Sequence, residues 1–242
     1  MSDKEINTLL VERYTALQSP WGRWKLNFYA SAKRASWRCV IFSAEFLKRF
    51  LDIIVSGTAL LLLSPLFLLV ASLIKVEDRG PVFFAQRRVG KWGREFRMFK
   101  FRSMCVDAEQ RLQAMLAKNQ HATGITFKAK DDPRITRIGK WLRKFSIDEF
   151  PQFYNVLKGD MSLVGPRPPV PREVAMYTPA DRRRLEVTPG LTCFWQIGGR
   201  AEIDFPEQVR LDLQYIESQS FWLDMKILLR TVPAVLLGRG AC

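Results

Sequence analysis

The sequence IIVSGTALLLLSPLFLLVASLI, residues 53–74, decides the fold because it carries no charge and is long enough to reach across a membrane. A straight helix of this length measures ~33 Å, about the thickness of the hydrocarbon core of a bilayer. Pro65 lacks a backbone donor and clashes with the carbonyl group of Leu61, so the helix is predicted to break there. The hydroxyl of Ser64 is placed to bond the freed carbonyl group.

Three structures are compatible with this stretch: a kinked helix that crosses, a re-entrant hairpin that enters and leaves on one face, and a buried core helix. The two arms, of ~18 Å and ~15 Å, are each too short to cross alone. A crossing helix should carry its basic excess on one side, because basic loops stay in the cytoplasm. Basic residues flank the stretch at 48–49 and again at 75 and 79, which favours the hairpin. Its uncharged length argues against a core helix.

The composition indicates an anionic partner. The chain has 242 residues, with 38 Lys+Arg against 24 Asp+Glu and a formal net charge of +14. Such an excess suits nucleic acid, lipid headgroups or a phosphorylated substrate. Widely spaced cysteines and a single histidine, His121, argue against a zinc knuckle, a disulfide framework or a multi-histidine metal site. The sequence contains no GxGxxG fingerprint or Walker A loop, so ATP-driven chemistry is not indicated.

Residues 1–46 form an N-terminal extension ahead of the predicted hairpin at 47–78, and residues 79–242 form the main domain. Aromatic and basic residues alternate in clusters over 21–38. This segment suits a helix in the headgroup layer, with its cations on anionic lipid, or equally an amphipathic helix packed on the protein. Asp52 is predicted to pair locally with Lys48 or Arg49.

A β-hairpin is predicted directly after the apolar stretch. Residues 82–84 and 96–101 have strand character, and the glycines at 90 and 93 supply the turn between them. Eight basic residues and one acid lie between Arg79 and Arg102. A solvated surface would mix the two signs, so this one-sided patch indicates phosphate capture.

The most informative polar motif follows a second basic cluster at 128–144. Ser146 and Glu149 match a capping box, which predicts a helix start with Asp148 in its first turn. Such acids usually only compensate the helix dipole. Here they follow seven cations and precede Arg167, which stands in the rigid loop 165–169. Two carboxylates in this setting suggest a site for a divalent metal and phosphate oxygens.

The remaining pattern predicts helices over 177–187 and 205–219 and a short strand over 193–197. The segment 221–237 is too apolar for a free surface helix, so it lies at the membrane interface or closes the core. The expected fold class is therefore α+β and mainly helical. It combines a re-entrant membrane helix–break–helix with a small cytoplasmic catalytic domain that carries a short β-hairpin and interfacial amphipathic helices.

Several motifs, in order, carry a family resemblance. They are KRFLDIIVSGTALLLLSPLFLLVASLIK, GPVFFAQRRVG, FRMFKFRSM, DPRITRIGKWLRKFSIDEFPQFYNVLKGDMSLVGPRP and the closing LDMKILLRTVPAVLLGRGA. From about Lys48 onward the chain resembles the bacterial sugar transferases, which are monotopic polyprenyl-phosphate phosphoglycosyl transferases. The resemblance implies an enzyme on the cytoplasmic face of the bacterial inner membrane. Its product would begin exopolysaccharide, capsule or O-antigen (lipopolysaccharide) assembly.

The resemblance also implies a reaction and its residues. A UDP-sugar, usually a UDP-hexose, gives its sugar-1-phosphate to undecaprenyl phosphate and releases UMP. Asp148 would attack the β-phosphorus and form a covalent phosphosugar intermediate, and with Glu149 it would hold Mg²⁺. Asp212 matches a family acidic position near the site. The residues expected to bind phosphate are Lys100, Arg102, Arg143, Arg167 and Arg200.

Two alternatives and one sequence departure remain. Transfer could be direct, in a ternary complex with Asp148 only a metal ligand, or the chain could be a non-enzymatic, membrane-tethered basic module. Nucleic acid is not the expected partner, a homodimer is compatible with the sequence, and the sugar is not determined. Similar proteins often read GLTGLWQVSGR where this chain has Cys193, Phe194 and Gly199. If that loop touches the nucleotide or sugar, specificity is altered.

Overall fold

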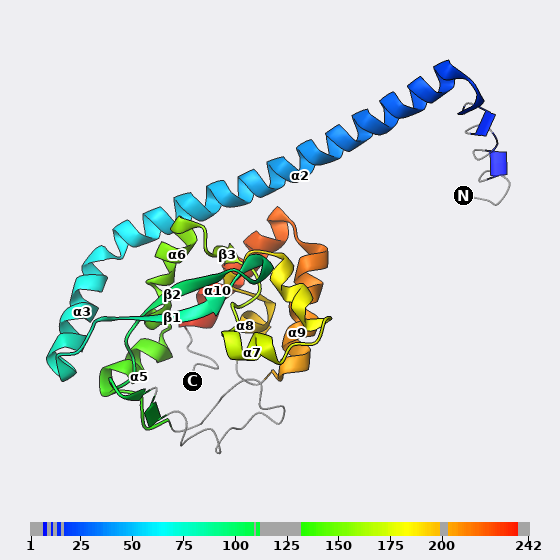
Figure 1. Ribbon diagram of the computed structural model, residues 1–242. Helices are drawn as coiled ribbons and strands as arrows, with labels where there is room; N and C mark the ends of the chain where they lie inside the picture. Colours follow the sequence, from blue (N-terminus) through cyan, green and yellow to red (C-terminus); the bar gives the residue numbers. More distant parts are fainter. Residues whose placement is uncertain are drawn as a thin grey trace. The chain divides into compact units, whose positions relative to one another are not determined.

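The computed structural model describes residues 7–8, 11, 14–15, 17–108, 110–111, 132–198 and 203–236 (Figure 1). The chain divides into two compact units, Met1–Lys48 and Arg49–Cys242. The boundary falls close to residue 46, where the sequence predicted the end of the N-terminal extension. The second unit holds every predicted site residue that the structure describes.

The apolar stretch forms two helices that meet at a sharp bend. Helix α2 spans Pro20–Leu62 and helix α3 spans Ser64–Asp78, with an angle of 58° between them. The hydroxyl of Ser64 donates to the carbonyl oxygen of Leu61 at 2.7 Å, and Pro65 lies in the first turn of α3. The predicted break and its hydrogen bond are thus confirmed. Of the helices described, none alone has the length and hydropathy to cross a membrane, whereas α2 and α3 together do.

The predicted hairpin is also confirmed, with a longer first strand. Strand β1 (Phe83–Val89) pairs antiparallel with β2 (Glu95–Phe101) in the register Phe83 to Phe101. The turn includes the short 3₁₀ helix η1 (Lys91–Gly93), where Trp92 and Gly93 have φ angles of 57° and 81°. Strand alternation places the even-numbered residues of both strands on one face, because cross-strand partners share a face.

The short 3₁₀ helix η3 (Ile147–Glu149) lies along the chain between helices α5 (Arg137–Lys144) and α6 (Gln152–Lys158). The predicted capping box is wrong, because Ser146 is left-handed, with φ at 54°, and makes no side-chain cap bond. The left-handed residue turns the chain between the end of α5 and η3. Gly159, with φ at 95°, ends α6.

A second, parallel strand pair joins β3 (Ser162–Val164) to β4 (Gly190–Thr192). Their backbones approach closely beside Gly165, since a Cβ on Gly190 would lie 2.0 Å from the amide nitrogen of Gly165. Only glycine fits at such a contact.

Two predicted elements in the following region are wrong. Residues 177–187 are not one helix: α7 spans Pro171–Ala175, and only the 3₁₀ helix η4 (Asp181–Glu186) follows. The proline at 179 disfavours a helical residue before it, and Thr178 instead bonds through its amide to Asp181 at 2.9 Å. The predicted strand at 193–197 is helix α8 (Phe194–Gly198), because the strand has already ended at Thr192.

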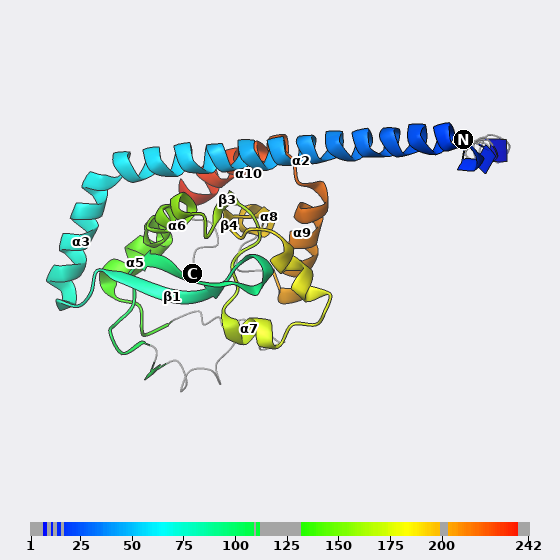
Figure 2. The same cartoon turned by 45° about the horizontal axis from the view of Figure 1, so that its top comes forward.

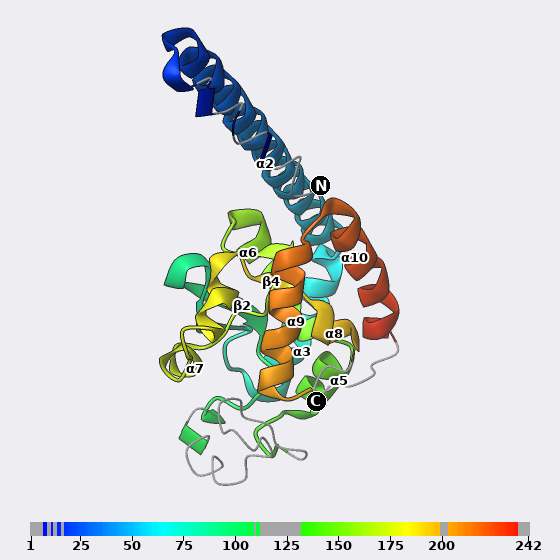
Figure 3. The same cartoon turned by 90° about the vertical axis from the view of Figure 1, so that its right-hand side faces the viewer.

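The last two helices match the sequence pattern. Helix α9 (Phe205–Ser218) begins at Asp204, whose carboxylate accepts from the amide of Glu207 at 3.2 Å. Helix α10 (Phe221–Leu236) packs against β3 and β4 (Figure 2). Figure 3 shows α9 and α10 following one another along the side of the domain, with α8 beside α9. Helix α10 closes the core through the buried Ile227, as predicted, and exposes Trp222 and Leu229 on its other face; its place at a membrane interface stays a prediction.

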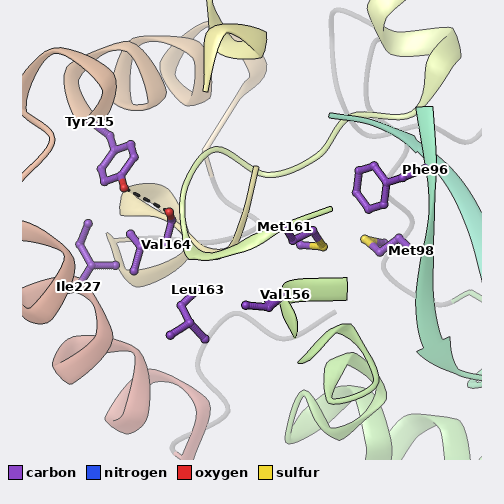
Figure 4. Packing of buried hydrophobic residues seen from close by; sticks show 8 residues of the cluster. All are labelled: Phe96, Met98, Val156, Met161, Leu163, Val164, Tyr215 and Ile227. Atoms are coloured by element: carbon purple, nitrogen blue, oxygen red, sulfur yellow. Dashed lines mark hydrogen bonds between the residues drawn. The ribbon is translucent and has the colours of Figure 1, made fainter. Parts of the chain in front are cut away.

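One hydrophobic cluster joins the hairpin to the C-terminal helices (Figure 4). Its buried members are Phe96, Met98, Val156, Met161, Leu163, Val164, Tyr215 and Ile227. The hydroxyl of Tyr215 lies 2.8 Å from Asp224 Oδ1 and 3.2 Å from the carbonyl oxygen of Val164, which ties α9 to α10 and to β3. This cluster fixes the hairpin relative to α6 and β3, which lead into the candidate site.

A second cluster packs α3 onto the domain. Val70 and Ile74 of α3 are buried against Phe101 and Leu142. Other apolar side chains of α3 are exposed, Leu68 at 72%. Helix α3 therefore has one face packed on protein and another that exposes apolar side chains.

Polar contacts attach the end of α2 to the same domain. Arg49 donates to the carbonyl oxygens of Val156 and Leu157 at 2.6 and 2.7 Å, and so caps the last turn of α6. Buried Asp52 accepts from the hydroxyl of Ser162 at 3.1 Å and from the amide of Leu163 at 2.9 Å. Arg49, a predicted local partner of Asp52, is thus directed to α6.

Candidate active site

The Asp-Glu pair lies where three separate segments meet. Helix η3 supplies Asp148, which is only 7% exposed, and the half-buried Glu149. Strand β2 supplies Lys100, whose Nζ lies 2.7 Å from Glu149 Oε1. The loop after β3 supplies Arg167, whose Nη1 lies 4.0 Å from the same oxygen. Two predicted cations, widely spaced in sequence, are therefore brought to the predicted carboxylate pair.

A buried amide ties α6, the helix that follows η3, to strand β2. Asn155 of α6 is fully buried and donates to the carbonyl oxygen of Arg97 at 2.7 Å. Its Oδ1 accepts from the amide of Phe99 at 2.9 Å. These bonds join α6 to the strand residue just before Lys100. The sequence signal was a lone amide within the apolar run FYNVL, and no predicted site residue included it.

The two carboxylates differ strongly in acidity. Burial raises the pKa of Asp148 to about 6, and the negative charge of Glu149 adds to this, while Lys100, Arg143 and Arg167 oppose it. Burial also favours a higher pKa for Glu149, but Lys100 and Arg167 outweigh it and lower this pKa to about 2. At pH 7 Glu149 is a fixed anion, while Asp148 is a desolvated carboxylate that still ionises.

Two backbone hydrogen bonds hold the loop that carries Arg167, one on each side of this residue. On one side the amide of Gly190 donates to Pro166 at 2.8 Å. On the other side the amide of Val89 donates to Pro169 at 2.9 Å. The guanidinium lies 5.9 Å from the ring centre of Trp195. The loop therefore directs one cation toward the dyad from a braced backbone.

Arg88 is a buried cation beside this loop that the sequence analysis did not single out. Its Nη1 donates to the carbonyl oxygen of Pro168 at 2.8 Å, and its Nη2 donates to Gln86 Oε1 at 2.7 Å. It is 8% exposed, whereas its neighbour Arg87 is exposed. Strand alternation was the available signal, because only one of two adjacent arginines in a half-buried strand can face inward.

Asp212 belongs to a separate buried ion pair. Arg184 donates to Asp212 Oδ2 through Nε at 2.8 Å, and its Nη2 lies 2.5 Å from the same oxygen. The Nη1 of Arg184 also donates to the hydroxyl of Tyr177 at 3.1 Å. Asp212 is 1% exposed. No hydrogen bond or ion pair among the described residues runs directly between Asp212 and the Asp-Glu pair.

The other predicted phosphate ligands are placed differently from one another. Arg102 is buried and forms an ion pair with Asp78 at the end of α3 instead of with the carboxylates of the dyad. Arg143 stands in the last turn of α5, and its charge favours the ionised form of Asp148. Arg200 lies outside the described residues.

The sequence departures that can be placed face the core. Cys193 is 2% exposed, and Phe194 meets the ring of Tyr215 edge-on at 6.0 Å. Gly199 lies outside the described residues. Cys193 and Phe194 are therefore packing substitutions in the part of the loop that is described.

The predicted Mg²⁺ would depend on Asp148 and Glu149. Within the described ranges no cluster of three or more His, Cys, Asp or Glu side chains is suited to a metal ion. Mg²⁺ commonly takes only one or two protein carboxylates and completes its shell with water and substrate phosphates. The carboxylate pair fits such a shared site and does not fit a cage made by protein alone.

The geometry defines an α+β domain with a buried carboxylate pair beside two cations, next to a bent apolar helix pair. Residues 43–238 match the family described as bacterial sugar transferase, and the chain belongs to that family.

Three relatives illustrate the similarity. The galactosyl transferase CpsE of Streptococcus agalactiae is 55% identical over 195 residues, which are 80% of this chain and 43% of that protein. The exopolysaccharide production protein ExoY of Sinorhizobium fredii is 42% identical over 197 residues, 80% of this chain and 87% of that protein. The UDP-N-acetylgalactosamine-undecaprenyl-phosphate N-acetylgalactosaminephosphotransferase of Aeromonas hydrophila is 43% identical over 206 residues, which are 81% of this chain and 45% of that protein. The chain thus spans under half of the first and third relatives.

Proposed function

We propose that this protein is a phosphoglycosyl transferase that moves a sugar-1-phosphate from a UDP-sugar to undecaprenyl phosphate and releases UMP. The observation that carries the proposal is the buried Asp148 beside the ionised Glu149, which Lys100 and Arg167 hold. The Aeromonas relative supports it, since its name states both a UDP-sugar and undecaprenyl phosphate. The name of the exopolysaccharide production protein ExoY supports a place in exopolysaccharide synthesis, and the name of the galactosyl transferase CpsE supports transfer of a sugar.

In the first step Asp148 acts as the nucleophile. A carboxylate oxygen forms a bond to the β-phosphorus of the UDP-sugar, and the bond from that phosphorus to the bridging oxygen breaks. UMP leaves with the bridging oxygen and its electron pair. Burial favours this step because a carboxylate with a raised pKa is the stronger nucleophile. The surrounding cations stabilise the negative charge that develops on the phosphates.

In the second step the lipid phosphate regenerates the enzyme. An oxygen of undecaprenyl phosphate forms a bond to the same phosphorus, and the bond between that phosphorus and Asp148 breaks. The products are the polyprenyl diphosphate sugar and the free carboxylate. Lys100 and Arg167, which both contact Glu149 of the dyad, would neutralise charge on the transferred phosphoryl group in both steps, so one set of cations serves both.

Mg²⁺ belongs to the proposal as a cofactor held by Asp148 and Glu149. When bound, it would neutralise charge on the pyrophosphate of the donor. Glu149 is suited to this because it stays ionised, with a pKa of about 2. Its contact with Lys100 uses Oε1, and the described bonds leave Oε2 for another ligand.

The membrane part of the proposal is a re-entrant hairpin inserted from the cytoplasmic face of the bacterial inner membrane. The bend at Leu63 and the exposed apolar face of α3 support it. Within the N-terminal unit, Trp21, Trp24 and Phe28 form an exposed stacked row, with ring centres 5.1 and 5.6 Å apart. With its neighbouring cations this row suits an anionic lipid surface.

Cysteine labelling in intact cells or oriented vesicles tests the topology. Single cysteines at Glu45 and Lys75, in a chain whose native cysteines are serine, should both react only from the cytoplasmic side. Reaction of the two positions from opposite sides would show a crossing helix and reject the hairpin.

Trapping tests the chemistry. Purified protein incubated with Mg²⁺ and a UDP-sugar labelled in the sugar, without acceptor, should gain label and release an equal amount of UMP. Asp148→Asn should do neither. Turnover with undecaprenyl phosphate but without labelled protein would instead support direct transfer in a ternary complex. If no UDP-sugar in a panel gives UMP, and salt-sensitive lipid binding is the only property found, the chain is a basic binding module.

A further inference from the structure

Arg88 is built into the support of the Arg167 loop. The even-numbered face of the hairpin carries Gln86, Arg88 and Lys100, since Gln86 pairs with Met98 and Arg88 pairs with Phe96 in register. Gln86 Oε1 accepts from both Nε and Nη2 of Arg88, at 3.1 and 2.7 Å. The guanidinium is thus oriented by its own strand before it meets the loop.

The loop receives two adjacent bonds from this strand. Arg88 Nη1 donates to the carbonyl oxygen of Pro168 at 2.8 Å, and the amide of Val89 donates to Pro169 at 2.9 Å. Proline residues have no amide hydrogen, so this part of the loop can be held only through its carbonyl oxygens. Pro168 directly follows Arg167, and a change at its carbonyl group shifts the backbone that aims the Arg167 side chain.

The charges of Arg88 and Glu149 also act on the side chain of Arg167. Burial and the neighbouring charge of Arg167 lower the pKa of Arg88 to about 10, so Arg88 remains a cation at neutral pH. The two guanidinium groups repel each other, while Glu149 attracts Arg167 from 4.0 Å. The attraction favours the orientation of Arg167 toward the dyad, and the charge of Arg88 also contributes to lowering the pKa of Glu149.

We propose that Arg88 is a positioning residue that holds Arg167 in place for phosphoryl transfer, acting through the carbonyl group of Pro168. This inference rests on the proposed function for its catalytic consequence. Its structural part, the bracing of residues 165–169, does not depend on which reaction the site performs.

Arginine is required because three of its nitrogens are used at once. Lysine at position 88 keeps the charge but offers a single ammonium group, which cannot copy the rigid fork that reaches Gln86 and Pro168. Arg87 provides a matched control on the same strand. It faces outward, is exposed, and its one described ion pair is a 4.0 Å contact with Glu95.

The kinetic arm compares Arg88→Lys with Arg87→Lys in the full chain. UMP release from the UDP-sugar should fall about 10- to 100-fold in kcat for Arg88→Lys, with a small change in KM, because misplacement of a charge affects the transition state most. Arg87→Lys should match the parent protein. The Arg167→Lys variant is then combined with Arg88→Lys. If Arg88 acts through Arg167, the second change adds little to the first.

The structural arm uses hydrogen exchange on the same proteins, followed by mass spectrometry of peptides covering 160–172. Exchange should accelerate in this region for Arg88→Lys, stay unchanged for Arg87→Lys, and melting temperatures should differ little. Unchanged exchange in Arg88→Lys, or kinetic effects that multiply fully with Arg167→Lys, would overturn the proposal. If the parent protein releases no UMP, the proposed function fails, but the exchange arm still decides whether Arg88 braces the loop.

Discussion

Asp148 and Asp212 are both buried, at 7% and 1% exposure, but among the described residues only Asp212 is bonded to a neighbouring side chain. Asp212 is bonded directly to Arg184. Among the described residues no side chain bonds directly to Asp148, and its cations act from a distance. A saturated carboxylate holds its neighbours in place, whereas a buried carboxylate without a bonded partner is left available for a ligand or for chemistry.

The largest expected effect comes from removing the charge of Asp148. Asp148→Asn should lower UMP release by about a thousandfold or more, because the nucleophile is lost. The same change should not lower the melting temperature, and should raise it if anything, since burial of the ionised acid destabilises the native state. Calorimetry beside the activity assay measures both. A clear loss of stability would show that Asp148 is a structural residue like Asp212.

The second effect concerns Asp212, the buried carboxylate that is bonded to Arg184. Asp212→Asn leaves the buried Arg184 without its charged partner, and we expect a loss of about 3 kcal/mol in the free energy of unfolding. Chemical denaturation of Asp212→Asn and Asp148→Asn side by side gives the comparison. Equal stabilities for the two variants would remove the distinction between a saturated and an available carboxylate.

The third effect is the pH dependence of the first half-reaction. Asp148 must be ionised to attack, and its pKa is about 6, so labelling by the UDP-sugar should fall about tenfold per pH unit below that value. Glu149 raises this pKa, so Glu149→Gln should move the acidic limb to lower pH. Single-turnover labelling across pH 4.5–8 measures the limb. A limb that stays in place in Glu149→Gln would mean that another group titrates.

The smallest effect concerns the cation shared by the pair. Lys100 favours the ionised form of Asp148, so Lys100→Met should move the acidic limb to higher pH, opposite to Glu149→Gln. Lys91, an exposed residue of the hairpin turn, serves as the control, and Lys91→Met should leave the limb in place. A shift to lower pH in Lys100→Met would contradict the electrostatic account of the dyad.

Some features followed from the sequence because their causes are local. Pro65 breaks the helix since it has no donor, and Ser64 bonds the freed carbonyl group from the next position. The glycines at 90 and 93 and the strand pattern predicted the hairpin, and the helix over 205–218 agreed with its periodicity. The mixed α+β class needed nothing beyond these rules.

Other predictions failed where distant groups compete with a local rule. Ser146 and Glu149 have capping-box spacing, but Glu149 pairs with Lys100 of strand β2, and Ser146 adopts a left-handed conformation. The apolar run 193–197 has strand character, yet it packs as α8, with Phe194 against Tyr215 in the core. In both cases burial and charge pairing outweigh a preference of the isolated segment.

The sequence by itself determined the break in the apolar stretch, the hairpin, and the presence of an Asp-Glu pair among cations, because each depends on residues close along the chain. Only the tertiary structure decided that Lys100 and Arg167 meet Glu149, that Arg184 saturates Asp212, and that Arg88 instead of Arg87 is buried. Ion pairing and burial act over a few ångströms in space, so they depend on how the chain folds back on itself.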